Sequence, residues 1–516
     1  MTRARITIDR DFTIGDVPRR LFGSFVEHMG RCVYSGIYEP GHPTATPEGY
    51  RQDVLDLTKE LGATVVRYPG GGGGGNFVSG YDWEDGVGPV ADRPRRLDGA
   101  WHTVETNAFG LHEFVGWSKA AGVEVMEAVN LGTRGVDAAR SLVEYANHPG
   151  GSKHSDMRRR NGAEEPFDIK LWCLGNEMDG PWQIGHKTAD EYGRLAQEAG
   201  KAMRLVDPSI ELVAFGSSNS GMPTFGQWEQ TVLGHTYDVV DYVSLHAYDQ
   251  EHDGDVRSFL ASAVDMDFFI ESVVATADAT GARLKNRKRI DLSFDEWNVW
   301  YQRGLDGEDQ PHRIEKAGWR EHPRVIEDEY SVTDAVVVGT LLNSLLRHGD
   351  RVKIANQAQL VNVIAPIRSE EGGPAWRQSI FWPFARMAQL ATGRILQVEV
   401  DSDRYDNDRF GTADVVDVSA TWDDEAGTVA LFLANRGLEE EASAEVALRG
   451  LDAGRIRRAE VLRVPEGGDR HSSNTVETGE QVGLVPLEGV HAEGGRLTLT
   501  LPALSWAVVV LDVTRS

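Results

Sequence analysis

Residues 169–177, IKLWCLGNE, and residues 290–296, IDLSFDE, are the two stretches that decide how this chain folds. Each is mainly apolar and β-branched or aromatic, and each ends at a glutamate, Glu177 or Glu296. Strands covered on both faces have continuous apolar sequences, as in parallel sheets flanked by helices. Both segments therefore predict buried parallel strands with a carboxyl group at the C-terminal end.

Six further apolar runs occur along the chain, and amphipathic helical stretches such as EGYRQDVLDLTKELG separate them. In chain order the eight runs are LFGSFVE (21–27), ATVVRYPG (63–70), VEVMEAVN (123–130), IKLWCLGNE (169–177), ELVAFG (211–216), YVSLHAY (242–248), IDLSFDE (290–296) and VKIANQAQL (352–360). Eight strand and helix units in series predict an α/β fold, a (β/α)8 TIM barrel. The two glutamates end its fourth and seventh strands.

The sequence changes character after about residue 385. Short β-rich runs such as RILQVEV, TVALFLANR and SWAVVVLDV follow one another with turn signals between them. They predict an all-β sandwich, jelly-roll-like, over residues 386–516. The N-terminal run RITIDRDF is expected to add strand 1–20 to that sandwich, which leaves residues 21–385 for the catalytic barrel.

Composition limits the possible partners and compartment. The 516 residues are 41% hydrophobic and 26% charged, with a net charge of −27 spread along the chain. Such a charge disfavours a nucleic-acid partner, and the absence of about 18 consecutive apolar residues predicts no membrane span. The N-terminus has no apolar signal-peptide core, so we expect a cytoplasmic protein. Cys32 and Cys173 lie in apolar segments and are expected to be unpaired core residues.

Polar residues gather at the ends of the predicted strands. At or just after the C-terminal ends lie Glu27, Asn130, Asn176, Glu177, His246, Tyr248, Glu296 and Gln359. In a barrel this is the face where active sites form, and eight polar strand ends are more than contact with solvent explains. Glycosidic bonds are cleaved by two carboxyl groups, one that donates a proton and one that is ionised.

Several motifs resemble one known family nearly end to end. They include GSFVEHMGRCVYSGIYEP, EEPFDIKLWCLGNEMDGPWQIGH, FDEWNVWY and ANQAQLVNVIAPI. The chain resembles the α-L-arabinofuranosidases of glycoside hydrolase family 51. The resemblance implies a retaining, exo-acting hydrolase (EC 3.2.1.55) that releases terminal non-reducing α-L-arabinofuranosyl residues from arabinoxylan, arabinan or derived oligosaccharides. It also implies a homo-oligomer, expected to be a hexamer.

The resemblance assigns the two catalytic roles, with Glu177 as general acid/base and Glu296 as nucleophile. For the acid role we expect the apolar neighbours Trp172 or Trp182, together with the charge of Glu296, to keep Glu177 protonated. Asn176 is expected to hold the sugar 2-hydroxyl.

The remaining implied contacts surround the same sugar. Glu27, Asn76, Tyr248 and Gln359 would contact the arabinose hydroxyls or the nucleophile, and Trp101 would form a wall. Two supporting residues are expected from their positions: Arg67 to pair with Glu296, and His246 to orient Glu296 or pack. No paired-histidine pattern or other ligand cluster is present in the sequence, so we expect no metal and no cofactor.

Two segments set this chain apart. Six glycines, Gly70 to Gly75, precede Asn76 where the family has two, either widening the pocket rim or only lengthening the loop. The polar segment from Tyr301 to Glu329 follows the seventh strand and is either a lid or subsite wall, with Trp319 stacking on sugar, or a surface excursion.

Two other functions stay open from the sequence. An endo-acting glucanase or xylanase of the same barrel superfamily would use the same paired glutamates. A non-catalytic sugar-binding relative is the third possibility. The presence of both Glu177 and Glu296 argues against it.

Overall fold

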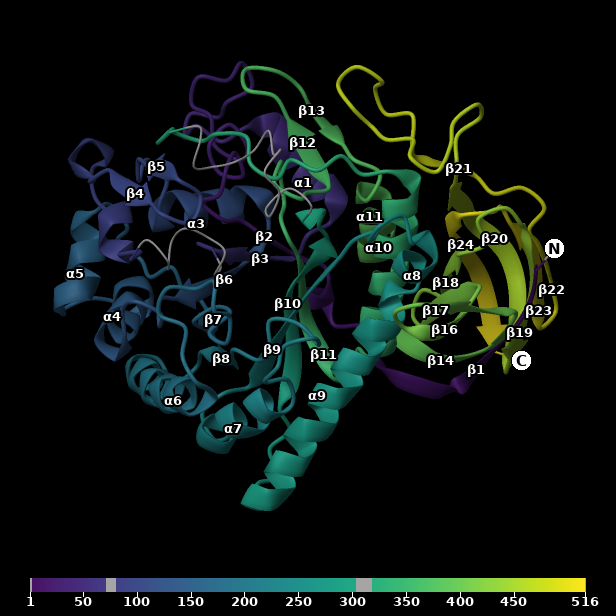
Figure 1. Ribbon diagram of the computed structural model, residues 1–516, viewed down its shortest axis with the longest axis horizontal. Coiled ribbons are helices and arrows are strands. Elements are labelled where there is room, and N and C mark those ends of the chain that lie inside the picture. Colours follow the sequence, from purple (N-terminus) through teal and green to yellow (C-terminus); the bar gives the residue numbers. More distant parts are fainter. Residues whose placement is uncertain (1, 71–79, 303–317, 516) are drawn as a thin grey trace.

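A closed barrel of eight parallel strands forms the larger part of the molecule (Figure 1). The computed structural model describes residues 2–70, 80–302 and 318–515. The barrel strands are β2 (Gly23–Phe25), β3 (Val65–Tyr68), β6 (Glu124–Val129), β7 (Leu171–Leu174), β8 (Glu211–Ala214), β9 (Tyr242–Asp249), β10 (Asp291–Val299) and β11 (Val352–Gln357). Each predicted run overlaps one of them, with β9 and β10 extending one and three residues beyond their runs, and β7 and β10 are the fourth and seventh strands, as predicted.

Helices surround the barrel where the sequence has helical periodicity. They are α1 (Gln52–Leu61), α3 (Leu111–Ala121), α4 (Val136–Asn147), α5 (Lys153–Arg160), α6 (Ala189–Val206), α7 (Gln227–Thr236), α8 (Val256–Leu260), α9 (Ser262–Leu284), α10 (Val332–Arg347) and α11 (Phe381–Leu390). Local signals fix their ends. Thr188 caps α6 by accepting a hydrogen bond from the backbone of Glu191, and Gly62 ends α1 at a φ of 78°.

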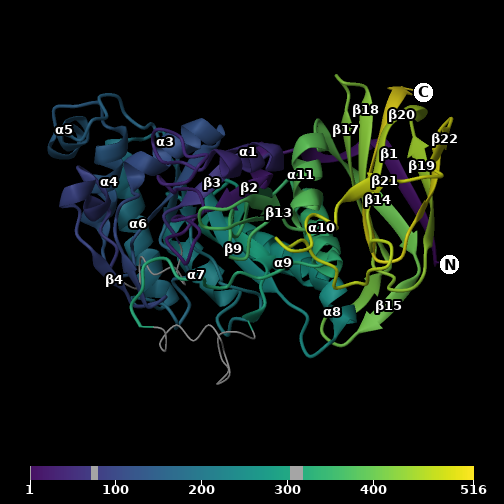
Figure 2. The ribbon, with the colours of Figure 1, turned by 90° about the horizontal axis from the view of Figure 1, so that it is seen from above.

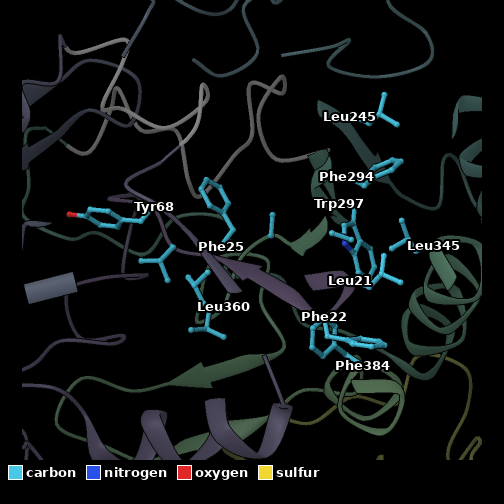
Figure 3. Close-up of a cluster of buried hydrophobic side chains, with 14 of the residues drawn as sticks. Leu21, Phe22, Phe25, Tyr68, Leu245, Phe294, Trp297, Leu345, Leu360 and Phe384 are labelled. Carbon is cyan, nitrogen blue, oxygen red and sulfur yellow. The ribbon is translucent and has the colours of Figure 1, made fainter. Parts of the chain in front are cut away.

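Apolar side chains fill the barrel on both sides of its wall. Inside it lie Val65, Met126, Ala128, Leu171, Cys173, Val213 and Ile354. Outside, Figure 3 shows Phe22 beside Phe384 of α11, with their rings edge to face at 6.2 Å. Cys32 and Cys173 are both buried and unpaired, as predicted.

The second part is a ten-stranded sheet with its own apolar core. Its order is β21 (Leu484–Pro486), β20 (Leu451–Leu462), β24 (Ser505–Arg515), β18 (Thr428–Asn435), β17 (Val416–Asp423), β14 (Arg394–Ser402), β1 (Thr2–Asp16), β19 (Ala442–Arg449), β23 (Arg496–Leu501) and β22 (His491–Glu493). The N-terminal strand β1 lies between β14 and β19. The C-terminal β domain and its N-terminal strand are thus confirmed, while the division at residue 385, inside α11, stays a prediction.

Helix α10 lies between the two parts (Figures 1 and 2). Residues Val332 to Leu346 of this helix are all buried, because the barrel covers one side and the sheet the other. A glycine permits the close approach: a Cβ atom at Gly339 would lie 2.2 Å from Cδ1 of Trp506. Within residues 2–70, 80–302 and 318–515, no helix is both long and apolar enough to cross a membrane.

Three small hairpins complete the fold. They are β4 (Arg96–Asp98) with β5 (Thr103–Glu105), β12 (Ile367–Ser369) with β13 (Ala375–Arg377), and β15 (Arg404–Asn407) with β16 (Gly411–Asp414). The first matters for the site, because the turn between β4 and β5 reaches the barrel mouth. The backbone N–H groups of Ala100 and Trp101 in that turn donate to Asp98 Oδ1 at 2.9 and 3.1 Å.

Candidate active site

A pocket of about 620 Å³ opens at the C-terminal end of the barrel strands. Its lining comes from many separate segments: Glu27, Met29, Gly99, Ala100, Trp101, Glu177, Trp182, Ile184, Ser218, Asn219, Tyr248, Glu296, Trp300, Gln302, Gln359 and Ile364. Besides the two glutamates, four of the predicted site residues line it, Glu27, Trp101, Tyr248 and Gln359, and two more, Arg67 and His246, contact a glutamate that does. The barrel therefore brings together side chains up to 332 positions apart in the chain.

Glu177 stands on a tight turn just after β7. The turn includes Gly175 at a φ of 88°, and Glu177 itself has a φ of 41°, a region that side-chain-bearing residues rarely occupy. Two neutral donors hold one oxygen of its carboxyl group. Trp182 Nε1 donates to Oε2 at 2.6 Å and Gln183 Nε2 donates to the same atom at 3.2 Å.

Glu296 extends from β10 and is held mainly by charge. Arg67 of β3, which is completely buried, donates to its Oε1 at 2.7 Å. The Tyr248 hydroxyl donates to Oε2 at 2.9 Å. The predicted pairing of Arg67 with Glu296 is confirmed, and the same guanidinium also donates to Asn176 Oδ1.

His246 joins the two carboxyl groups. Its Nδ1 lies 3.2 Å from Glu177 Oε1 and 3.3 Å from Glu296 Oε2. Its Nε2 lies 3.3 Å from Oδ1 of Asp295, a buried residue beneath the pocket floor. One oxygen each of Glu177 and Glu296 and the imidazole nitrogen all lie within 4.8 Å of one another. His246 thus contacts Glu296, as it would if it orients that carboxyl group, and it contacts Glu177 as well; its orienting role stays a prediction.

The protonation order differs from the sequence prediction. Burial favours a higher pKa for Glu177, but the hydrogen bond and the charge of His246, with Trp182 and Gln183, lower it overall. Burial and the charge of Glu177 raise the pKa of Glu296, although His246 and Arg67 oppose this. The prediction that apolar neighbours keep Glu177 protonated is wrong for this arrangement. Trp182 presents its N–H to the carboxylate, and Trp172 donates instead to the Ile169 carbonyl.

Unpartnered polar atoms mark the side of the pocket beyond the carboxyl groups. Buried atoms with no hydrogen-bond partner there include Glu27 Oε1, Trp101 Nε1, Asn176 Nδ2, Trp300 Nε1 and Gln359 Oε1. Gln359 Nε2 donates to Glu27 Oε2 at 3.3 Å, so these two groups are held together. Buried polar groups usually have partners, so this set points to a polar ligand.

The same arrangement bears on metal binding. Among the described residues, the compact group of possible ligands is Glu177, His246 and Glu296. The carboxylates are already engaged, by Arg67 for Glu296 and by Trp182 for Glu177. Nδ1 is within hydrogen-bond distance of both carboxyl groups, which favours a bound proton there over a cation. The donor set therefore does not fit a resident metal.

Two predicted features fall elsewhere. Asn76 and all but the first of the six glycines lie outside the described residues, as does part of the segment after β10. Trp319, expected to stack on sugar, instead stacks on His102 with ring centroids 3.9 Å apart and does not line the pocket. The adjoining Arg320 carbonyl accepts a hydrogen bond from Val104 N at 2.9 Å, so this segment braces the β4–β5 hairpin.

Several residues of the site had no assigned role in the sequence analysis. Asp295 immediately precedes Glu296, and the acidic pair in FDEW is the signal that could have identified it. Gln183 lies six positions after Glu177, in the segment that follows the turn. Ser218, Asn219, Trp300 and Gln302 line the pocket from the loops after β8 and β10. Loop residues carry no periodicity that would reveal their direction.

Comparisons with known proteins identify the family of this chain. Two family models match, the α-L-arabinofuranosidase 1 domain over residues 57–263 and the α-L-arabinofuranosidase C-terminal domain over residues 295–505. The chain is 56% identical to an intracellular exo-α-(1→5)-L-arabinofuranosidase of Streptomyces lividans over 98% of this chain and 75% of that protein. It is 51% identical to an exo-α-(1→6)-L-arabinofuranosidase of Bifidobacterium longum, over 99% and 97% of the two chains.

Comparison with solved structures identifies the same family. A family 51 α-L-arabinofuranosidase from Bifidobacterium longum, AbfB, superposes with a TM-score of 0.92 at 47% identity, covering 99% of this chain and 100% of that one. Identity of this extent over nearly the whole chain, with the barrel and the paired glutamates in place, is more than a shared fold. The chain is an enzyme that belongs to the α-L-arabinofuranosidases of glycoside hydrolase family 51.

Proposed function

We propose that this protein is a retaining, exo-acting hydrolase that releases terminal non-reducing α-L-arabinofuranosyl residues by double displacement. One observation carries the proposal: an oxygen of Glu177 and an oxygen of Glu296 lie within 4.8 Å of each other in one pocket. Retaining enzymes place their carboxyl groups about 5 to 5.5 Å apart, whereas inverting enzymes leave about 6.5 to 9.5 Å for a water molecule. The short separation supports direct attack by a carboxylate.

The surroundings support different roles for the two glutamates. Glu296 is the nucleophile, because Arg67 and Tyr248 fix both of its oxygens and favour the charged form. Glu177 is the general acid and base, because it lines the pocket, has no arginine among the described residues on its carboxyl group and contacts a group that can exchange protons, His246.

The unpartnered atoms define how the sugar is held. Asn176 Nδ2 is free because Arg67 fixes the other end of its amide, and it is placed to donate to the sugar 2-hydroxyl beside Glu296. Glu27 and Gln359 offer acceptors to further hydroxyls. Trp101 closes the pocket as a wall. Tyr248 acts on the nucleophile rather than on a free hydroxyl.

Pocket shape and the relatives support exo action on arabinan, arabinoxylan or oligosaccharides derived from them. The carboxyl groups lie within a pocket whose rim carries the half-exposed Trp182 and the exposed Ile184. Such a rim suits a leaving group outside a single bound furanose. The two relatives compared above are named for 1→5 and 1→6 linkages, so resemblance alone does not fix the linkage. One of them is named intracellular, which supports action on imported oligosaccharides inside the cell.

The test uses a chromogenic α-L-arabinofuranoside beside carboxymethylcellulose and xylan, with the change Glu296→Ala as control. We expect hydrolysis of the arabinofuranoside, no endo-cleavage of either polymer, and loss of activity in the variant. Proton NMR of the first product should show the α-anomer. Appearance of the β-anomer first would exclude the retaining mechanism, and chain shortening of either polymer would favour an endo-acting enzyme. If the wild type and Glu296→Ala bound the arabinofuranoside equally and neither hydrolysed it, the protein would be a sugar-binding protein.

A further inference from the structure

The His246 side chain reaches both carboxyl groups of the pocket and the carboxyl group of Asp295. Its Nδ1 lies 3.2 Å from Glu177 Oε1 and 3.3 Å from Glu296 Oε2, and its Nε2 lies 3.3 Å from Asp295 Oδ1. The imidazole is completely buried. Phe215 packs edge to face against the ring with centroids 5.0 Å apart, so the ring orientation is fixed.

Both ring nitrogens therefore face carboxylate oxygens. A neutral imidazole has one N–H and one lone pair, so one of its nitrogens would face an oxygen with no proton between them. An imidazolium has an N–H on each side: the one on Nδ1 faces the two glutamate oxygens, and the one on Nε2 lies 3.3 Å from Asp295 Oδ1 as an ion pair without hydrogen-bond geometry. The charged groups around it, from every strand that packs against it, are Arg67 on β3, Glu177 and Asp179 after β7, and Asp295 and Glu296 on β10. Acidic groups outnumber Arg67, and although burial lowers the pKa of His246, they raise it to about 10.

We propose that His246 stores the proton that Glu177 passes to the leaving group, and takes it back after Glu177 has activated water. The proposal rests on the retaining mechanism proposed above. It explains how Glu177 can act as the general acid, because a general acid that is ionised in the free enzyme needs a nearby proton source. Glu177 and His246 then act as one proton-holding pair.

The first half of the reaction balances as follows. Glu296 attacks the anomeric carbon, and a new C–O bond forms while the glycosidic C–O bond breaks with its electron pair on the leaving oxygen. The ester that forms has no negative charge, so the attraction that holds the proton on His246 weakens at that moment. The Nδ1–H bond breaks with its electrons on nitrogen, the proton passes to Glu177, and Glu177 protonates the leaving oxygen.

The second half reverses these transfers. Glu177 removes a proton from water, whose oxygen attacks the anomeric carbon while the ester bond breaks and Glu296 regains its charge. That charge again favours the imidazolium, so the proton on Glu177 returns to Nδ1 of His246. The sum is hydrolysis of one glycosidic bond by one water, with every protein group restored.

Asp295 decides which nitrogen gives up its proton. Its Oδ1 faces Nε2 and accepts from the Ser244 hydroxyl, and its Oδ2 accepts from Cys173 Sγ at 3.5 Å. Burial opposes a charge on Asp295, but Arg67 and His246 lower its pKa overall. A permanent carboxylate there keeps Nε2 protonated, so only the Nδ1 proton is exchangeable. Asp295 is thus a positioning residue.

The kinetic test separates proton supply from attack. The change His246→Asn keeps an N–H donor near the Nδ1 position but has no exchangeable charge. A methyl arabinofuranoside needs a proton on its leaving group, whereas a 2,4-dinitrophenyl arabinofuranoside does not. We expect kcat/KM to fall about 100-fold for the first and less than about threefold for the second, and the basic limb of the pH profile to move to lower pH. Tyr248→Phe, which disturbs the nucleophile, should slow both substrates equally.

A spectroscopic measurement covers the case in which the variant folds poorly. Nitrogen-15 NMR of histidine-labelled wild-type enzyme should show an imidazolium at position 246 in the free enzyme. The signal should change to a neutral imidazole in the glycosyl-enzyme trapped with a 2-deoxy-2-fluoro arabinofuranoside, and placing the nitrogen-15 label on residue 246 alone in the wild-type sequence assigns it without any variant. An imidazolium in both states, or equal losses on both substrates, overturns the proton store. Activity that survives Glu296→Ala would instead overturn the proposed function.

Discussion

Glu296 and Glu127 are both buried glutamates of the barrel wall, but their hydrogen-bond partners differ. Glu296 on β10 is 5% exposed and Glu127 on β6 is fully buried. Glu296 receives hydrogen bonds from Arg67 and Tyr248. Neither oxygen of Glu127 has a hydrogen-bond partner. Burial by itself therefore does not identify a working carboxylate; the donors around it do.

The side of the barrel wall to which each side chain points explains why their partners differ. Met126 and Ala128 point into the barrel, so Glu127 between them points outward, among apolar groups near Tyr68 and Tyr81. Burial alone raises the pKa of Glu127 well above its usual value. A neutral carboxyl group is the physical consequence, because an isolated charge there has no compensation. Glu296 faces the inside of the mouth, where a buried arginine is available.

The largest expected effect comes from removing that arginine. Arg67→Met removes the buried guanidinium from Glu296 and Asp295, and leaves His246 as the charged group in contact with each. We expect the free energy of unfolding, measured by urea denaturation, to fall by about 3 to 5 kcal/mol. The value of kcat should fall about 10³-fold because the nucleophile is no longer fixed. Arg67→Lys should recover part of the stability but little of the rate, because it lacks the fork that also holds Asn176. Unchanged stability in Arg67→Met would contradict this account.

Removing the unpartnered carboxyl group of Glu127 should stabilise the protein. Glu127→Met replaces an unpartnered carboxyl with an apolar chain of similar size. Because the pKa of Glu127 is raised on folding, the wild type loses stability as pH rises above the unfolded value of about 4.3, by about 1.4 kcal/mol per unit until the folded pKa is reached. The variant should thus be stabilised relative to the wild type by more at pH 7 than at pH 4.

Urea unfolding at both pH values measures that gain, with Glu124→Gln as the matched control. Glu124 is on the same strand but is paired with Arg20 at the surface. That variant should show no gain at pH 7. Equal stability of Glu127→Met and wild type at pH 7 would mean that the Glu127 carboxyl costs nothing where it lies.

A smaller effect is expected from the neutral donor on Glu296. Tyr248→Phe removes the hydroxyl that donates to Oε2 at 2.9 Å and leaves Arg67 in place. A hydrogen bond to a charged group contributes about 1.5 to 3 kcal/mol, so kcat/KM should fall about 10- to 100-fold. The remaining activity should need a higher pH, because the pKa of Glu296 rises further without this donor. A loss as large as that of Glu296→Ala would mean that Tyr248 does more than hold the nucleophile.

Much of this comparison could be predicted from the sequence, and its limits have a physical cause. The eight strands, their order and the pairing of Arg67 with Glu296 follow from apolar runs that end in polar residues. Glu127 was not singled out, because a glutamate in an apolar strand carries no sign of which face it occupies. The structure reveals it because neighbouring positions fill the barrel interior.

Protonation was the part that the sequence did not predict correctly. Trp182 was expected to shield Glu177 as an apolar surface, but an indole has an apolar face and a donor edge, and only coordinates tell which one is presented. His246 was expected to support Glu296, and its similar distance to Glu177 depends on where the turn after β7 places that residue. Asn130 is a polar strand end whose side chain has a structural role instead. It ends a strand, but its amide is engaged by Tyr81, Gly132 and Thr133 and builds a turn.

Glu177 lies between Glu296 and Glu127 in its surroundings, because neutral donors and an imidazole shared with Glu296 hold its carboxyl group. Removing one of these neutral donors gives the smallest expected effect. Trp182→Phe keeps the aromatic wall and removes the N–H that donates to Oε2 at 2.6 Å. Losing a donor to the carboxylate raises the pKa of Glu177, so the basic limb of kcat/KM should move up by less than about one pH unit. Ile184→Ala, an exposed rim position with no donor, should change KM for polymeric substrates and leave the pH profile in place. If both variants moved the limb equally, access to the pocket rather than the hydrogen bond would set the pKa of Glu177.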